Sequence, residues 1–134
     1  MLTPRQNLHY AIGELAYAIA SADGKIQKEE RKKFHDMVAA EIRCGDPQYE
    51  LADINFQLLE KDKVSPATAY EWAMKEIRVN SHYLSPELKN AYIQFMEKIA
   101  RAHPPVTIDE TDLIEKFKKD IEPIHGDPVF YLQK

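Results

Sequence analysis

The stretch "IASADGKIQKEE" (residues 19–30) decides the fold of this chain, because it places an Asp-Gly pair between two helix-like runs. Gly24 adopts a positive φ readily, and Asp23 bonds nearby backbone donors easily, so the pair predicts a tight turn. The first helix should end before Asp23, and a second should begin near Gln27 with Glu30 in its first turn. The stretch therefore predicts a helix-turn-helix corner.

The corner has a weaker copy in "IARAHPPVTIDE" (residues 99–110), at a constant offset along the chain. The offset places His103 at the position of Asp23 and Glu110 at the position of Glu30. The aliphatic residues that should plug the two corners are Ile26 and Val106. A duplicated corner of this kind indicates an internal repeat. We expect the two corners to lie side by side in one bundle, with their polar side chains converging.

Capping signals divide the rest of the chain into further helices. Helix starts are expected at Thr3, Asp46, Ser65, Ser85 and Thr107. Four of these precede a proline at the first helical position, and Thr107 forms a capping box with Glu110. Gly45 should stop the second helix as a left-handed cap. No run alternates with the period of a strand. The sequence predicts an all-α, single-domain bundle of about six to seven helices with two related helix-turn-helix corners.

Helical spacing assigns the inward faces of these helices, and the first helix should carry one apolar stripe. The residues expected inside are Leu8, Ile12, Leu15, Ile19, Glu30, Phe34, Met37, Val38, Ile42, Leu51, Ile54, Leu58, Leu59, Tyr70, Ala73, Met74, Ile77, Leu88, Tyr92, Phe95, Met96, Ile99, Leu113, Ile114, Phe117 and Ile121. We expect Trp72 to fill the core or an interface rather than to stack on a ligand.

The chain divides into a helical bundle at residues 1–122 and a C-terminal tail at residues 123–134. Two prolines and a glycine exclude a long helix in the tail. Its apolar residues are Val129, Phe130, Tyr131 and Leu132. Because such residues are poorly suited to lie free in water, we expect the tail to dock on the bundle or on a partner subunit. Homo-oligomer formation through the tail stays open.

Composition limits the classes of partner and compartment. The 134 residues carry a net charge of -4, and acidic and basic residues are mixed along the chain. Because the chain lacks a basic stripe, nucleic acid is not an expected partner. The single cysteine, Cys44, cannot form an internal disulfide and fits a reducing compartment. The sequence contains no export signal or membrane helix, so we expect a soluble cytoplasmic protein with no membrane insertion.

The two corners resemble the motif of the tellurite-resistance TerB-like family. That motif is a helix ending in A-x-A-D-G-x-[IV], followed by an acidic residue and repeated near the C-terminus. "ASADGKIQKEE" matches the first copy closely, whereas "ARAHPPVTIDE" matches the second in part, over a resemblance that covers roughly residues 5–122. The resemblance implies an all-helical domain of bacterial stress-response systems that binds metal ions through acidic corner residues and acts as an interaction module without a catalytic step.

Carried over by position, the resemblance gives Asp23, Glu30 and Glu110 as metal ligands, with His103 in place of the remaining acidic residue. An imidazole there would extend the preference beyond hard oxygen-binding ions. Two interpretations stay open at these residues: a divalent metal ion (Ca, Mg, Mn or Zn), or no cofactor at all. In that architectural alternative, Asp23 and Gly24 form only a turn, and Glu30 and Glu110 only stabilise helix N-termini.

The first corner also resembles the second half of an EF-hand loop. Asp23, Gly24, Ile26 and Glu30 occupy its fifth, sixth, eighth and twelfth places. The first half of the motif fails, because Ile19 stands where the anchoring aspartate belongs. A site with two protein carboxylates would bind calcium weakly.

The sequence contains no GxSxG, P-loop or HExxH motif, so we expect a non-enzymatic module that docks to a protein partner. The alternative is a metal-dependent, hydrolase-like enzyme that uses a His and carboxylate cluster around His103. Binding of a divalent ion is common to both hypotheses, and turnover separates them.

Overall fold

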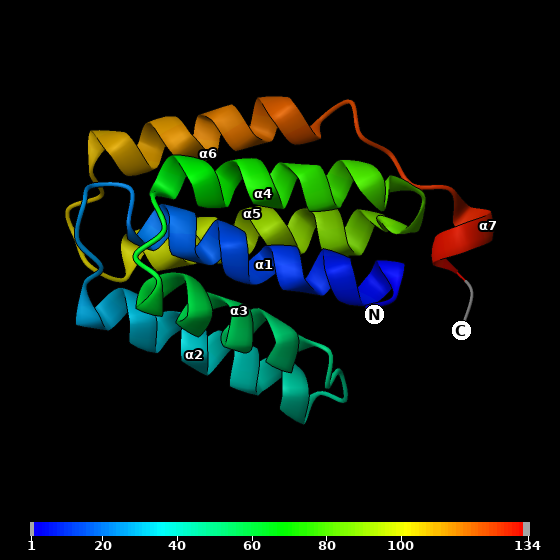
Figure 1. The fold of residues 1–134 in the computed structure, drawn as a ribbon, viewed down its shortest axis with the longest axis horizontal. Coiled ribbons are helices and arrows are strands. Elements are labelled where there is room, and N and C mark those ends of the chain that lie inside the picture. The colour runs from blue at the N-terminus through cyan, green and yellow to red at the C-terminus, as the bar shows by residue number, and fades with distance from the viewer. Residues whose placement is uncertain (1, 133–134) are drawn as a thin grey trace.

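The computed structural model describes residues 2–132, and within that range the chain forms helices and no strand. The elements are α1 (Pro4–Ala20), α2 (Lys28–Arg43), α3 (Tyr49–Lys61), α4 (Pro66–Val79), the short 3-10 helix η1 (Ser81–Tyr83), α5 (Pro86–Arg101), α6 (Ile108–Ile121) and α7 (Pro128–Tyr131). The predicted all-α bundle is confirmed (Figure 1). No helix of the described range combines the length and the apolar character needed to cross a bilayer.

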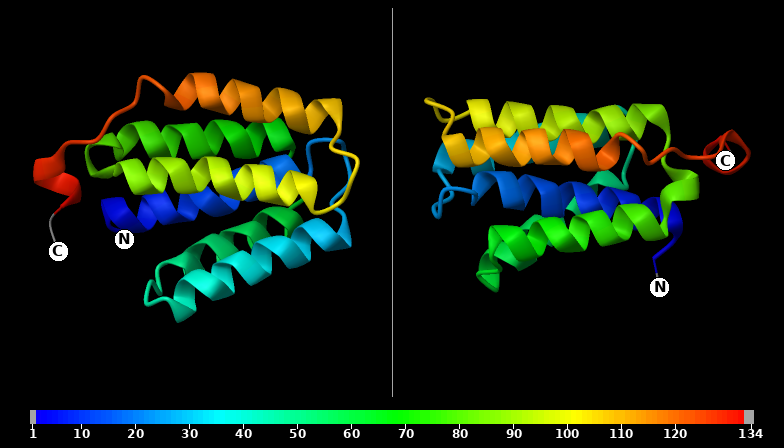
Figure 2. Two further views of the ribbon diagram at one scale, coloured as in Figure 1. Left: turned by 180° about the vertical axis from the view of Figure 1, so that it is seen from behind. Right: turned by 90° about the horizontal axis from the view of Figure 1, so that it is seen from above.

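Helix α1 is the centre of the bundle and contacts every helix from α2 to α6. Helices α3 and α4 flank α1 on the face seen in Figure 1, and α5 lies behind it. Helix α2 packs against α3, while α6 packs against α5 (Figures 1 and 2). The chain therefore wraps its later helices around its first one.

The prediction of one apolar stripe on the first helix is wrong, because α1 is buried on all sides over most of its length. Apart from the partly buried Tyr10, residues 8–20 are all buried. The small residues that make this possible are Ala11, Gly13, Ala16, Ala18 and Ala20. Because small side chains let neighbouring helices approach closely, a helix rich in them accepts partners around its whole circumference.

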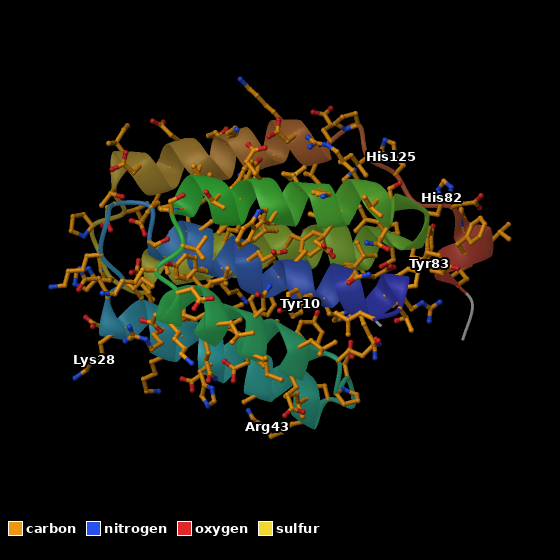
Figure 3. All side chains as sticks on the ribbon, in the orientation of Figure 1. Tyr10, Lys28, Arg43, His82, Tyr83 and His125 are labelled. Carbon is orange, nitrogen blue, oxygen red and sulfur yellow. The ribbon has the colours of Figure 1, made fainter. Side chains whose placement is uncertain are left out.

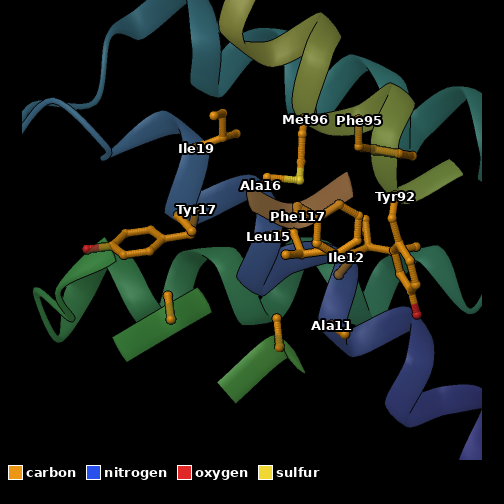
Figure 4. Close-up of a cluster of buried hydrophobic side chains, with 14 of the residues drawn as sticks. Ala11, Ile12, Leu15, Ala16, Tyr17, Ile19, Tyr92, Phe95, Met96 and Phe117 are labelled. Carbon is orange, nitrogen blue, oxygen red and sulfur yellow. The ribbon is translucent and has the colours of Figure 1, made fainter. Parts of the chain in front are cut away.

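The core surrounds α1, and Figure 4 shows the part of it where α1 meets α5 and α6. Phe117 of α6 and Tyr92 of α5 meet edge to face, with ring centroids 6.1 Å apart. Further rings stack where α2 approaches α3, with 4.9 Å between Phe34 and Phe56. Most of the predicted inward residues are buried or packed against this core.

Three of the predicted inward residues are exposed instead: Ile42 (38%), Ile54 (46%) and Leu58 (46%). The buried face of α3 is formed by Tyr49, Ala52, Asn55, Phe56 and Leu59, and it leaves Ile54 and Leu58 on the outer side of the helix. Asn55 is accepted inside because its amide donates to the Tyr10 carbonyl at 2.9 Å. A buried polar residue therefore displaced the apolar stripe that spacing predicted.

The predicted caps are confirmed at Thr3, Ser65, Ser85 and Thr107, each of which accepts a backbone N–H in its own first turn. Gly45 has a φ of +101° and follows the end of α2, as predicted. Asp46 differs, because it accepts from the Gln48 N–H at 3.2 Å in a turn, and α3 begins only at Tyr49.

Helix α7 lies against η1 and the start of α1. The Phe130 ring stacks on His82 with centroids 5.2 Å apart, and Arg5 Nη2 donates to the Tyr131 carbonyl at 3.0 Å. The Asp127 N–H donates to the His82 carbonyl at 2.9 Å. The division into a bundle at residues 1–122 and a tail at residues 123–134 stays a prediction, as does an oligomer formed through the tail.

Tyr92→Phe should destabilise the fold by about 1–2 kcal/mol, because it removes a buried hydroxyl that donates to the Leu8 carbonyl at 2.8 Å. Urea unfolding followed by circular dichroism measures this loss. Tyr83→Phe, which changes a partly buried ring at the surface, is the matched control and should change the free energy of unfolding by less than about 0.5 kcal/mol. Equal effects of the two substitutions would contradict the assignment.

Candidate metal centre at the paired corners

The two corners lie at the same end of the bundle. The loop between α1 and α2 and the loop between α5 and α6 appear together at one end in every view of Figures 1 and 2. Across them, His103 Nε2 lies 3.7 Å from Glu29 Oε2 at the start of α2. The predicted juxtaposition of the corners is therefore observed.

In the first corner, Asp23 and Gly24 form the turn that the architectural interpretation predicts. Gly24 has a φ of +94°, and its N–H donates to the Ser21 carbonyl at 2.9 Å. Asp23 Oδ1 accepts from the Lys25 N–H at 3.2 Å. Ile19 still belongs to α1, so its backbone is helical where an EF-hand loop would begin. The EF-hand interpretation is therefore wrong.

Glu30 and Glu110 occupy equivalent positions in the two corners. Glu30 Oε1 accepts from the Gln27 N–H at 2.9 Å, and Glu110 Oε1 accepts from the Thr107 N–H at 2.8 Å. The two residues are only 2% and 1% exposed. Each carboxyl thus bonds the backbone just before its own helix with one oxygen and keeps the other oxygen for a different partner.

The two carboxyls meet each other. Burial raises the pKa of Glu30 to about 8, the Gln27 N–H opposes that shift, and the neighbouring Glu110 carboxyl and the charge of Asp23 add to it. Glu110 Oε2 is buried and has no hydrogen-bond partner among the described residues. A proton held between the carboxyls supplies that missing donor. Glu30 therefore holds a proton near neutral pH, in a position where a cation would also offset the charge of the pair.

The other two predicted ligands are placed differently. Asp23 lies close enough for its charge to act on Glu30, but it is exposed and bonded within its own turn. His103 has Glu29 as its polar neighbour. Over residues 2–132, no group of three or more His, Cys, Asp or Glu side chains is placed to hold a metal ion. Ligation by Asp23, Glu30, His103 and Glu110 stays a prediction.

The donor chemistry of the pair fits a hard divalent cation. Two adjacent carboxyls offer only oxygen, and the buried Glu110 Oε2 lacks a partner. Mg²⁺ binds through one or two carboxylates and retains several waters, and Ca²⁺ accepts carboxylates, carbonyls and water. Zn²⁺ in proteins prefers nitrogen and sulfur ligands, and His103 faces Glu29 instead of completing such a set. The residues present therefore fit Mg²⁺, Ca²⁺ or Mn²⁺ better than Zn²⁺.

The two corners differ in the burial of their equivalent aliphatic residues, Ile26 and Val106. Ile26 packs against the core, whereas Val106 is 41% exposed. The consecutive prolines after His103 set the path of the second loop, so its backbone does not repeat the Asp-Gly turn of the first. The acidic positions are thus the part of the repeat that both corners share.

Sequence reasoning missed Glu14, a buried carboxyl in the middle of α1. It is 4% exposed, and its Oε1 has no hydrogen-bond partner. Burial raises its pKa to about 8, the charge of Glu76 adds to the shift, and the Asn55 side chain opposes it. The available signal was a lone acidic residue in the second part of α1, where residues 11–20 are otherwise small, aliphatic or aromatic.

A family model described as "Tellurite resistance protein TerB" matches residues 9–123. Searches of curated proteins and of solved structures found no match to the chain. The matched range includes both corners and Glu14.

Proposed function

The chain belongs to the tellurite resistance protein TerB family, and on that premise we propose that it is a non-enzymatic helical module that docks to a partner protein and binds a divalent cation weakly at Glu30 and Glu110. The observation that carries the cation part of the proposal is the contact between these two buried carboxyls from separate corners.

A cation is the expected ligand because the pair requires positive charge to ionise fully. Two carboxylates in contact repel each other, and burial increases the cost of that repulsion. A proton relieves the repulsion below the raised pKa of Glu30, and a divalent ion would relieve it above. With two protein carboxylates and water as ligands, we expect dissociation constants in the range of about 0.1–1 mM.

The non-enzymatic part rests on the lack of a catalytic motif in the sequence and on family membership. The hydrolase-like alternative requires an imidazole beside the carboxyl pair, and His103 instead neighbours Glu29. Since no observation favours that alternative, we do not propose it. A role in bacterial stress response, a cytoplasmic location and any relevance of tellurite stay predictions from the family resemblance.

The cation site is tested by urea unfolding at about pH 8.5, with and without about 10 mM Mg²⁺, Ca²⁺ or Mn²⁺ at matched ionic strength. At least one ion should stabilise the native state by about 1.4–2.7 kcal/mol, the gain for a ligand at 10 to 100 times its dissociation constant. The gain should shrink at about pH 6.5, because a proton then occupies the pair.

Matched variants identify the ligands. Glu110→Gln keeps a side-chain oxygen for the Thr107 N–H but loses the charge, so it should abolish the gain. Asp109→Asn makes the same charge change at an exposed neighbour and should retain it. His103→Ala should also retain the gain in stability, because the His103 ring lies beside Glu29 and is not one of the proposed ligands. Lack of stabilisation by every ion, or full stabilisation of Glu110→Gln, would overturn the cation site.

A further inference from the structure

Helices α3, α1 and α4 form one side-by-side layer on the face seen in Figure 1. The outer edges of this layer are occupied. On α3, Asp53 lies 3.5 Å from His35 of α2, and on α4 the Tyr70 hydroxyl donates to Asp120 of α6 at 2.6 Å. The remaining sides of α3 and α4 flank α1, and Tyr10 of α1 is labelled between them in Figure 3. We call this surface the α3–α1–α4 face.

The α3–α1–α4 face carries exposed apolar side chains from both flanking helices. They are Ile54 (46% exposed) and Leu58 (46%) on α3, and Trp72 (45%) and Val79 (74%) on α4. Leu58 lies one turn after Asn55, which reaches α1, and Ile54 lies one turn before Leu58. Trp72 and Val79 lie one turn before and after Glu76, whose charge acts on Glu14 of α1, so helical spacing places both pairs beside the α1 surface. Exposed apolar side chains gathered on one surface favour an interaction site.

The centre of the face is acidic. Glu14 of α1 lies between Asn55 of α3, whose side chain bonds it, and Glu76 of α4, whose charge acts on it. Burial and the nearby charges of Glu14 and Glu76 also raise the pKa of Tyr10. Among residues 2–132, neither Glu14 nor Glu76 forms an ion pair. Burial raises the pKa of Glu76, and the positive charge of the neighbouring Lys75 opposes that shift without cancelling it.

We propose that the α3–α1–α4 face docks an amphipathic helix of a partner protein, whose apolar side chains cover Trp72 and Leu58 and whose single central lysine or arginine pairs with Glu14 and Glu76. The proposal deepens the docking part of the proposed function and is independent of the cation site. Charge complementarity selects this occupant. The Glu76 carboxylate has no ion-pair partner among residues 2–132, and a cation beside it would favour release of the proton that burial holds on Glu14, whose Oε1 lacks a donor.

The same charges disfavour a second copy of this chain as the occupant. A two-fold contact through this face would bring the Glu76 carboxylate of one protomer toward that of the other and would place no cation beside Glu14. Like charges brought together in an apolar contact are costly. A tryptophan at an apolar surface is, in contrast, a common anchor for a different partner, because its large ring becomes buried on binding.

Trp72 is the only tryptophan of the chain, so its fluorescence reports on this face. The probe is a synthetic helix-forming peptide of about 16 residues with leucines along one stripe and one lysine at the centre of that stripe. A matched peptide carries glutamate in place of that lysine. The lysine peptide should shift the Trp72 emission to the blue and bind about tenfold more tightly than the glutamate peptide.

Because the net charge of -4 alone favours a basic peptide, variants with equal charge separate the two effects. Glu14→Gln/Glu76→Gln should reduce the preference to within about twofold, whereas Glu29→Gln/Glu115→Gln, at exposed sites, should keep it. Glu110→Gln should bind the lysine peptide normally, which separates this inference from the cation site.

Amide NMR shifts of the protein with the lysine peptide should concentrate on α1, α3 and α4. Lack of binding, equal affinity for the two peptides, or shifts concentrated on α2, α5 or α6 would overturn the proposal. Shifts concentrated on α2, α5 or α6 would mean that the protein docks a partner through a different surface.

Discussion

Raising the pH from about 5 to about 8.5 should lower the free energy of unfolding by several kcal/mol, because two buried carboxyls have their pKa raised to about 8. Glu14 and Glu30 hold their protons in the native state and release them on unfolding, where the pKa is near 4.5. The native state therefore binds more protons than the unfolded state between these values. Stability is highest below the unfolded pKa and falls as the pH rises through the native one. Each carboxyl contributes about 2–4 kcal/mol to this loss.

Urea unfolding across that pH range measures the effect, and Gln variants assign it. Glu30→Gln and Glu14→Gln mimic the protonated carboxyl permanently, so each should remove its own share of the pH dependence. Glu115→Gln, at a side chain that is 64% exposed, should leave the curve unchanged. A wild-type stability that stays level or rises between these pH values would contradict the protonated state of both carboxyls.

Gly13→Ala should destabilise the protein by about 2 kcal/mol or more, although alanine is the better helix former. A Cβ at position 13 would overlap the carbonyl oxygen of Ala52 and lie 3.0 Å from its carbonyl carbon and 3.1 Å from Asn55 Cβ. The overlapped atom belongs to the backbone of α3, so it cannot turn away as a side chain would. The substitution therefore forces α1 and α3 apart at the centre of the bundle.

Thermal and urea unfolding measure this loss, and Gly45→Ala is its control. An added Cβ at Gly45 meets no atom within 4 Å, and its φ of +101° costs about 1–2 kcal/mol as backbone strain alone. Gly13→Ala should also broaden NMR signals along α3, whereas Gly45→Ala should not. A stabilised Gly13→Ala protein would contradict the close approach of the two helices.

The helices could be predicted from the sequence because their boundaries depend on local chemistry. Thr3, Ser65, Ser85 and Thr107 each satisfy a backbone donor within one turn, and Gly45 adopts a left-handed conformation, so neighbouring residues suffice to place them. The exposed side of α3 could not be predicted this way. Its orientation depends on Asn55 reaching the carbonyl of Tyr10, which is distant in sequence.

Part of the candidate site was also predictable, because Glu30 and Glu110 are held by local contacts at the starts of their helices. The repeat placed Glu30 and Glu110 at equivalent positions, and helix N-terminal capping holds both carboxyls at the same end of the bundle. The repeat could not place the side chain of His103, because the proline-rich loop differs from the Asp-Gly turn. It also gave no information on Glu14, whose environment is created by α3 and α4 packing around α1.

The most direct test of the central claim is an NMR titration of the Glu30 and Glu110 side-chain carboxyl carbons, with and without Ca²⁺ or Mg²⁺. Without the ion, the pair should show a protonation step near the pKa of about 8 that burial and mutual contact give Glu30. A saturating ion should move that step down by at least about one pH unit, since proton and cation compete for the same oxygens. A Glu30 carboxyl that titrates near its unfolded-state pKa of 4.5, or a raised step that neither ion moves, would contradict it.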